Sequence, residues 1–247
     1  MTLLESIGRT ILQCVRFIPL AFIKSLRYYC YPIKITWLNK SGPTPWQDIR
    51  FFLILNHTSI IEFIYGGALP FSFLWRMAGR LTFPVAKETL DHPFLGFLFK
   101  SLAPYVVPIT RKRDDTWNQF TSGINNQSMV AILPEGRMRR QTGLDKNNQP
   151  MSTRSGVAEI LPHFAGEKLL FVYSGGLHHV LPPGKKIPRP FRKIAVAIEV
   201  VDTDDYLNTL GYQSINQETS PEQIKAFAQK VANDLDVRRQ KYTPNLV

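Results

Sequence analysis

Short apolar runs recur along the chain, separated by segments that mix polar and apolar residues. Five runs are continuous, bulky and rich in branched or aromatic side chains, which is typical of strands covered on both faces. They occupy residues 51–55, 105–109, 129–133, 169–174 and 194–200. Helix-like segments lie between them, at residues 60–65, 93–102, 115–125 and 155–164. This alternation predicts an α/β fold with helices flanking a mostly parallel central sheet.

The pattern predicts the C-terminal part of the fold more clearly than the part after the first run. The gap between the first and second runs is too long for a simple crossover, so the pattern leaves the topology there open. The last helix is well defined, because Ser220 can cap it, Pro221 suits its first turn and Gln223 completes a capping box. Its expected buried stripe is Ile224, Phe227, Val231 and Leu235. From Arg238 onward we expect the chain to fray.

The first 30 residues carry a helical period. Apolar side chains recur every three or four positions and form one stripe. They are Leu4, Ile7, Ile11, Val15, Ile18, Phe22, Leu26 and Tyr29. Arg9, Arg16 and Arg27 project onto the opposite side. Because Pro19 lacks an N–H and clashes within a helix, the pattern predicts an amphipathic segment of two short helices.

Two interpretations of this segment stay open. Arg16, Lys24 and Arg27 interrupt it, so it is not expected to span a membrane, and it lacks the pattern of a signal peptide. It packs on its own domain, or it lies in a membrane interface with its arginines on lipid phosphates. A break at residues 41–45 then divides the chain into a helical membrane anchor, residues 1–40, and an α/β domain, residues 41–247.

The formal charge of +11 calls for a polyanionic partner, either nucleic acid or an anionic membrane surface. No zinc-finger spacing or RNP-like signature favours nucleic acid, so anionic membrane lipid is the expected partner. A second basic stretch contains Lys185, Lys186, Arg189, Arg192 and Lys193. It is either a solvated loop or a further contact with anionic lipid. The two cysteines, Cys14 and Cys30, do not suggest a disulfide framework.

The candidate chemistry follows the first apolar run. His57 stands just past that strand, and Glu62 follows five residues later. Imidazole takes a proton near neutral pH, and a carboxylate can orient it and stabilise the imidazolium. Five residues is too far for neighbours on one helix, so we place His57 in a turn and Glu62 in the first turn of a following helix. On spacing alone, a structural histidine is the competing interpretation.

A second block changes that balance, because Leu133-Pro134-Glu135-Gly136-Arg137 follows the third run. Together with the His57–Glu62 block, it resembles the glycerolipid acyltransferase superfamily, of the lysophosphatidate acyltransferase type. Residues 86–96, 107–111 and 169–173 are similar to further segments of that family, and the resemblance covers roughly residues 50–175. This sequence departs from the family pattern at three places. Glu62 stands where most members have Asp, Arg137 directly follows Gly136 where a Thr is usual, and Thr110 replaces an Asp before Arg111.

The resemblance implies acyl transfer from acyl-CoA or acyl-carrier protein to a lysophospholipid hydroxyl, most directly 1-acyl-sn-glycerol 3-phosphate, with no further cofactor. His57 and Glu62 would be catalytic. Arg111, Glu135, Gly136 and Arg137 would bind substrate, the arginines through its phosphate. The competing interpretations are a solvated basic cluster for Arg111 and a structural ion pair with Arg111 or Arg137 for Glu135.

The remaining expectations concern other basic residues, the oxyanion and the location of the protein. Arg139 and Arg140 are expected to face the membrane or solvent, and the adjacent His178 and His179 do not complete a metal site. Oxyanion donors are expected among backbone N–H groups near Gly136 or at the start of the helix after His57. The protein is expected at the cytoplasmic face of a membrane, peripheral or monotopic. The alternatives are acylation of glycerol 3-phosphate, another lysophospholipid or a lipid A precursor, or a non-catalytic basic protein that binds membrane or nucleic acid.

Overall fold

The computed structural model describes residues 3–39, 46–110, 114–212 and 220–245. The chain divides into two compact units, each made of two stretches of sequence. The first contains residues 1–33 and 63–131, and the second contains residues 34–62 and 132–247. The N-terminal helix therefore groups with residues 63–131, which differs from the expected division at residues 41–45. Residues 40–45 lie outside the described residues, so that anchor boundary stays a prediction.

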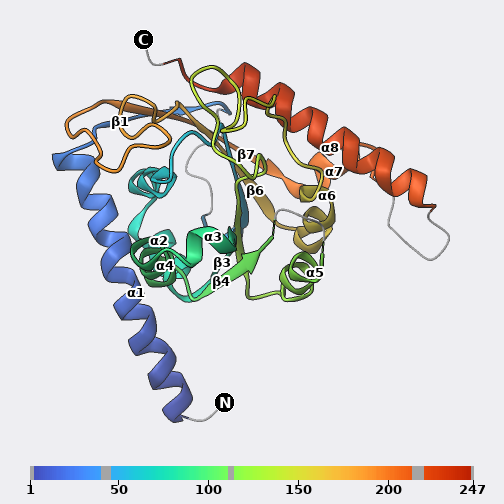
Figure 1. Cartoon of the computed structure of the whole chain (residues 1–247). Helices are drawn as coiled ribbons and strands as arrows, with labels where there is room; N and C mark the ends of the chain where they lie inside the picture. Colours follow the sequence, from blue (N-terminus) through green and yellow to red (C-terminus); the bar gives the residue numbers. More distant parts are fainter. Residues whose placement is uncertain (1–2, 40–45, 111–113, 213–219, 246–247) are drawn as a thin grey trace. The chain divides into compact units, whose positions relative to one another are not determined.

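Among its described residues, the first unit contains three strands, five α-helices and all but the first residue of the 3-10 helix η2 (Glu62–Ala68). Figure 1 shows α1 beside α2. Strand β3 pairs in parallel with both β4 and β5, so it lies between them. The elements are α1 (Leu3–Tyr29), α2 (Phe71–Arg80), β3 (Leu81–Ala86), α3 (Lys87–Leu90), α4 (Pro93–Leu102), β4 (Tyr105–Ile109), α5 (Asp115–Ser122) and β5 (Met129–Ile132). The unpredicted β3 and α2 fill the gap that was too long for one crossover.

The second unit has the strand order β1-β7-β6-β2, with β2 parallel to β6 and β7 antiparallel to β6. Its elements are β1 (Ile33–Trp37), the 3-10 helix η1 (Trp46–Asp48), β2 (Ile49–Leu55), α6 (Val157–Ile160), η3 (Leu161–Phe164), β6 (Lys168–Ser174), β7 (Ile194–Asp202), α7 (Thr203–Thr209) and α8 (Pro221–Tyr242). The short 3-10 helix η2 (Glu62–Ala68) starts at the last residue of the unit's first stretch. The predicted fold class, α/β with a mostly parallel sheet flanked by helices, is confirmed.

Strands β2 and β6 lie in the core of the second unit, as their continuous apolar sequences predict. Every residue of β2 except Ile54 is buried, and every residue of β6 except Lys168 is buried. Phe51 of β2 stacks on Phe164 of η3, with ring centroids 4.9 Å apart. The parallel register pairs Leu55 with Tyr173, so the two strands reach their carboxyl ends side by side. This register determines where the segments that follow each strand begin.

The N-terminal segment is one helix, and the prediction of two short helices is wrong, because α1 continues through Pro19. Its inner side packs on α2 and is tied there by polar contacts. Gln13 Nε2 donates to the Trp75 carbonyl at 2.8 Å, and Lys24 Nζ donates to the Leu69 carbonyl at 2.6 Å. The ring of Phe17 lies edge-on to Trp75 at 5.4 Å. These contacts lie on both sides of Pro19, and they help the helix to continue although Pro19 cannot donate a hydrogen bond.

The expected apolar stripe of α1 lies on the outer side. Its members Ile7, Ile11, Val15, Ile18, Phe22 and Tyr29 are 48% to 77% exposed, whereas Leu20 and Ile23 on the inner side are buried. The stripe therefore does not serve to pack the helix on its own unit. Among the described residues, α1 is the one helix long and apolar enough, by length and composition, to cross a membrane.

The C-terminal helix begins with the expected capping box, in which Ser220 and Gln223 bond reciprocally. The expectation that the chain frays from Arg238 is wrong, because α8 continues to Tyr242. Arg238 donates to Glu199 of β7 at 2.8 Å and to Asp234 at 2.7 Å. The same two carboxylates accept from the hydroxyls of Tyr173 and Tyr206. This network anchors the end of α8 to β6, β7 and α7.

Candidate functional site

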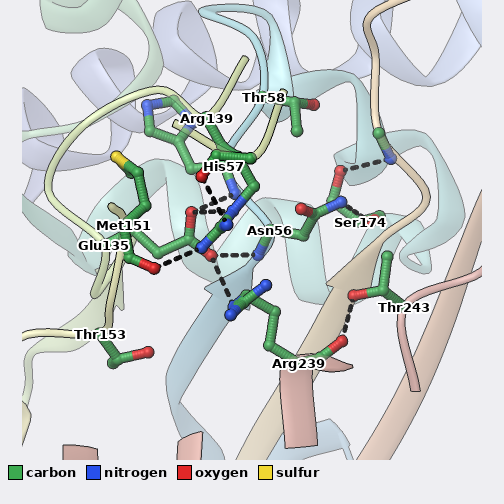
Figure 2. Close-up of polar contacts among 12 residues, drawn as sticks. Asn56, His57, Thr58, Glu135, Arg139, Met151, Thr153, Ser174, Arg239 and Thr243 are labelled. Carbon is green, nitrogen blue, oxygen red and sulfur yellow. Dashed lines mark hydrogen bonds and ion pairs between the residues drawn. The ribbon is translucent and has the colours of Figure 1, made fainter. Parts of the chain in front are cut away.

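The site begins at the turn that follows β2. Asn56 has a φ of 68°, in the left-handed region that asparagine tolerates better than most residues. Its side-chain Nδ2 donates to the carbonyl of Ser174, the last residue of β6, at 2.9 Å (Figure 2). Because β2 and β6 end side by side, this bond is short and local in space although it joins positions 118 residues apart. The left-handed turn at Asn56 therefore places His57 just past the carboxyl ends of β2 and β6.

A buried carboxylate holds this turn in place. Glu135 is 1% exposed, and its two oxygens accept from the backbone N–H of Asn56 at 2.8 Å and of His57 at 3.2 Å (Figure 2). The N–H of Arg139 donates to the His57 carbonyl at 2.7 Å. Both backbone groups of His57 are thus engaged by the segment that follows β5. The backbone position of His57 is therefore set.

His57 and Glu62 are brought together, as the sequence suggested. His57 Nδ1 lies 3.7 Å from Glu62 Oε1, and the two side chains are 18% and 4% exposed. Glu62 is the first residue of η2, so it starts a 3-10 helix where the sequence suggested the first turn of an α-helix. Its Oε1 also accepts from the backbone N–H of Thr58 at 2.7 Å and of Ser59 at 3.2 Å. The carboxylate therefore holds the turn that precedes η2 and faces the imidazole at the same time.

Two atoms of this pair are buried without a hydrogen-bond partner among the described residues: His57 Nδ1 and Glu62 Oε2. An unsatisfied buried polar atom costs about 1–3 kcal/mol, and catalytic hydrogen bonds are often long in the absence of substrate. With Nδ1 directed at the carboxylate, Nε2 is the ring nitrogen that can take a proton from a reacting group.

Two guanidinium groups balance the charge of Glu135. Arg139 Nε lies 3.8 Å from Oε2, and Arg239 Nε of α8 lies 3.6 Å from Oε1. Burial raises the pKa of the Glu135 carboxyl, and the two arginines and the Asn56 N–H act against that rise. Burial also lowers the pKa of Arg139. The positive charge and the two backbone N–H groups therefore offset part of the cost of burying this carboxylate.

Gly136 and Arg137 have structural partners of their own. Gly136 has a φ of 63°, and a Cβ there would lie 3.0 Å from Arg154 Nε, so the turn after Glu135 favours glycine. Arg137 pairs through Nη1 with the buried Asp145. The pKa of Asp145 is lowered, chiefly by the hydrogen bond from the Gln149 N–H. Arg137 remains partly exposed, at 31%, so a phosphate could share it with Asp145.

Several expectations about this site need correction or stay open. Arg139 is not solvated: it is 13% exposed, pairs with Glu135 and donates to the carbonyls of Gly143 and Met151. The suggested oxyanion donors already have acceptors, since Gly136 N–H bonds to Leu133 O while Thr58 and Ser59 bond to Glu62. Arg111 lies outside the described residues, so its phosphate role stays a prediction.

Residues that sequence reasoning missed complete the site. Arg239 is distant in sequence and lies in a segment expected to fray, and no local pattern marks it. Asn56 carried a usable signal, because asparagine directly after a buried strand favours a left-handed turn. His178 and His179 bond separately to the carbonyls of Arg139 and Lys193. Among the described residues, no three His, Cys, Asp or Glu side chains form a group that could hold a metal ion.

Fold and site together define a class: an α/β protein with a histidine–carboxylate pair at the carboxyl end of a parallel strand. The chain belongs to the acyltransferase family, whose model matches residues 38–171, more than half of the sequence. Among solved structures, the chain is similar to the 1-acyl-sn-glycerophosphate (LPA) acyltransferase PlsC from Thermotoga maritima. The identity is 14%, over 90% of this chain and 81% of that one, with a TM-score of 0.46. No curated protein matches the sequence significantly.

The double role of Glu62 predicts different effects for two substitutions. In Glu62→Gln, the amide oxygen can still accept from Thr58 and Ser59, so we expect the unfolding temperature to change little. The negative charge beside His57 is lost, so kcat for acyl transfer should fall about 100-fold or more. Glu62→Ala should lose activity to the same extent and also about 1 kcal/mol of stability, because the buried N–H groups of Thr58 and Ser59 lose their acceptor. Steady-state kinetics and thermal unfolding measure the two effects.

The matched control is Glu62→Asp, which keeps the charge and should retain part of the activity. A Gln variant with wild-type kcat would show that the carboxylate serves only to hold the turn at Thr58 and Ser59.

Arg239 is expected to act on the reaction through Glu135. In Arg239→Met, the pKa of Glu135 should rise further, so its protonated form should persist to higher pH and fail to accept both N–H groups of the turn. We expect kcat to fall about tenfold near neutral pH, or about 1.4 kcal/mol, with KM little changed. The acid limb of the pH profile of kcat should move to higher pH, and Arg239→Lys should restore part of the loss.

The neighbouring Arg238 is the control, because it bonds to Glu199 and Asp234 and not to Glu135. Arg238→Met should lower the unfolding temperature while leaving the acid limb in place. Equal shifts of the pH profile in both variants would mean that α8 acts only through stability.

Proposed function

We propose that this acyltransferase transfers a fatty acyl group from acyl-CoA or acyl-carrier protein to a lysophospholipid hydroxyl, most directly 1-acyl-sn-glycerol 3-phosphate, to give phosphatidic acid. The observation that carries the proposal is the pairing of His57 Nδ1 with Glu62 Oε1 at 3.7 Å, beside a turn whose backbone is held by Glu135. Oxygen acyl transfer needs a base for the acceptor hydroxyl, and this pair supplies one.

The proposed reaction is a direct transfer. His57 Nε2 removes the proton from the acceptor hydroxyl while the oxygen attacks the thioester carbonyl. The tetrahedral intermediate then expels the thiolate, which takes the proton from the imidazolium, so that the products are an ester and a free thiol. Glu62 orients the ring and stabilises its positive charge between the two steps. Cys14 and Cys30 lie on α1 and directly after it, in the first unit, so no nucleophilic role is proposed for them.

The acceptor proposal depends on positive charge close to this pair. Arg137 is partly exposed and directly follows Gly136, so it is the described residue best suited to a substrate phosphate. Arg111 is proposed as its partner from the sequence pattern alone. The same residues could also bind the competing acceptors, because each of these carries a phosphate and a hydroxyl, although in a different arrangement. These acceptors are glycerol 3-phosphate, another lysophospholipid and a lipid A precursor.

Release of thiol from acyl-CoA by the purified protein, measured with a panel of lysolipid acceptors, tests both the chemistry and the acceptor. His57→Ala should reduce kcat about 10²–10⁴-fold because the base is lost. The control is His92→Ala, since His92 caps α4 in the other unit and should affect only stability. Full activity in His57→Ala would refute the base assignment. The lysolipid proposal would be refuted if none of the lysolipid acceptors in the panel increased the release of thiol.

We also propose that the protein lies on the cytoplasmic face of a membrane through α1. The inner side of the helix is tied to α2 through Gln13 and Lys24, while its outer apolar stripe is exposed. This arrangement suits a helix lying in the interface, with the stripe among the acyl chains and nearby basic residues at the lipid phosphates. It also suits a lysolipid acceptor, which resides in the bilayer.

Replacing two stripe residues tests this anchor without disturbing the packed side. Ile11→Ser with Ile18→Ser should weaken pelleting with anionic vesicles by about tenfold or more, since burying each side chain in lipid contributes roughly 1.5–3 kcal/mol. Val237→Ser, on α8 in the other unit, is the control because Val237 is 60% exposed and should leave pelleting unchanged. Wild-type pelleting by the stripe variant would remove the anchor from the proposal.

A further inference from the structure

A basic loop leaves the second unit between Leu181 and β7. All residues from 184 to 193 are exposed, and residues 182 to 193 contain no acid. Five of them carry positive charge: Lys185, Lys186, Arg189, Arg192 and Lys193. We refer to residues 182–193 as the basic loop. A segment with this charge attracts an anionic surface at short range.

Two large apolar side chains stand out from the basic loop. Ile187 is 82% exposed and Phe191 is 75% exposed. Phe191 also has a φ of 59°, a left-handed conformation that is strained for an aromatic residue. Packing of the ring within the protein does not offset this strain, because the ring faces outward. Apolar side chains among lysines and arginines, with no acid nearby, are typical of segments that enter the interface of an anionic bilayer.

Hydrogen bonds and prolines restrict the conformation of the basic loop. The N–H of Arg189 donates to the Val180 carbonyl at 2.9 Å, and the N–H of Lys185 donates to the Pro182 carbonyl at 3.1 Å. At the far end, His179 Nε2 bonds to the Lys193 carbonyl at 2.7 Å. Four prolines, at 182, 183, 188 and 190, restrict the backbone between these bonds. Little conformational entropy is then lost when the loop meets a surface.

The base of the loop contacts the catalytic turn. The N–H of Leu177 donates to Thr58 Oγ1 at 2.7 Å, and Ser59 Oγ donates to the Leu181 carbonyl at 2.7 Å. His178 Nε2 bonds to the Arg139 carbonyl at 2.8 Å, and the Arg139 N–H bonds to the His57 carbonyl. The segment that supports residues 57–59 is therefore the same segment that carries Ile187 and Phe191.

We propose that the basic loop is a second membrane contact, independent of α1, which inserts Ile187 and Phe191 into an anionic leaflet and brings the catalytic turn to the lipid surface. Charge and apolar exposure together favour lipid over an acidic protein or nucleic acid, since neither of those partners requires both features at one tip. The second part of this inference rests on the proposed function, because an acceptor that resides in the bilayer has to reach His57. The membrane contact itself is measurable without acyl transfer.

The test uses the full chain with Ile187→Ser and Phe191→Ser combined, and Val237→Ser as the matched control. Binding is measured by pelleting with vesicles of phosphatidylcholine containing phosphatidylglycerol, and with phosphatidylcholine alone. We expect the double variant to bind the anionic vesicles about tenfold more weakly than the wild type, and the control to bind as the wild type does. Lys185→Gln with Lys186→Gln should weaken binding to the anionic vesicles and leave the residual binding to neutral ones unchanged.

Acyl transfer is then measured to lysophosphatidate held in the anionic vesicles and to a short-chain, water-soluble lysophosphatidate. The double variant should lose activity on the vesicle acceptor in proportion to binding and keep wild-type activity on the soluble one. Unchanged vesicle binding would overturn the proposal, as would an equal loss on both acceptors, which would mean that the loop serves the site directly. Loss of binding to an acyl-carrier protein or a nucleic acid, with vesicle binding intact, would also overturn it. If the wild type transfers to neither acceptor, the proposed function fails while the binding result still decides the role of the loop.

Discussion

The buried carboxylate of Glu135 is the interaction on which the site depends. A carboxylate taken out of water is costly unless hydrogen bonds and opposite charge replace its hydration. Here the backbone N–H groups of Asn56 and His57 supply the hydrogen bonds, and Arg139 and Arg239 supply the charge. The same bonds fix the turn that presents His57. The requirement to stabilise one buried charge therefore also positions the base.

This arrangement joins elements that are far apart along the chain. The turn follows β2, the carboxylate follows β5, the Ser174 carbonyl that receives Asn56 ends β6, and Arg239 lies in the last helix. Glu62 contributes within the same stretch as His57, by accepting from the Thr58 N–H while facing the ring. Most of the positioning therefore comes from backbone groups and buried ion pairs. Glu62 is held by the N–H groups of Thr58 and Ser59, whereas the His57 ring faces Glu62 and is 18% exposed.

Two surfaces of the protein expose apolar side chains. A protein in water gains stability by burying apolar side chains, yet the outer stripe of α1 and the tip of the basic loop leave theirs exposed. In both places the exposed groups are carried by segments with firm polar attachments, through Gln13 and Lys24 in one unit and through Val180 and His179 in the other. Rigid attachment keeps apolar groups available to lipid and prevents their collapse onto the protein's own core.

The sequence alone determined the strands of the core, the capped C-terminal helix, the N-terminal amphipathic pattern and the His57–Glu62 pair, because each depends on local periodicity or on residues a few positions apart. It did not reveal β1, β3 or α2, whose patterns are short or mixed with charge, nor the continuity of α1 through Pro19. Only the tertiary structure decided that the apolar stripe faces outward, that Glu135 and Arg139 are buried partners, and that Arg239 belongs to the site. Those outcomes depend on which segments pack together in space. Periodicity does not tell which side of α1 is covered, and the pairing of Glu135 with Arg239, far along the chain, leaves no periodic trace in a single sequence.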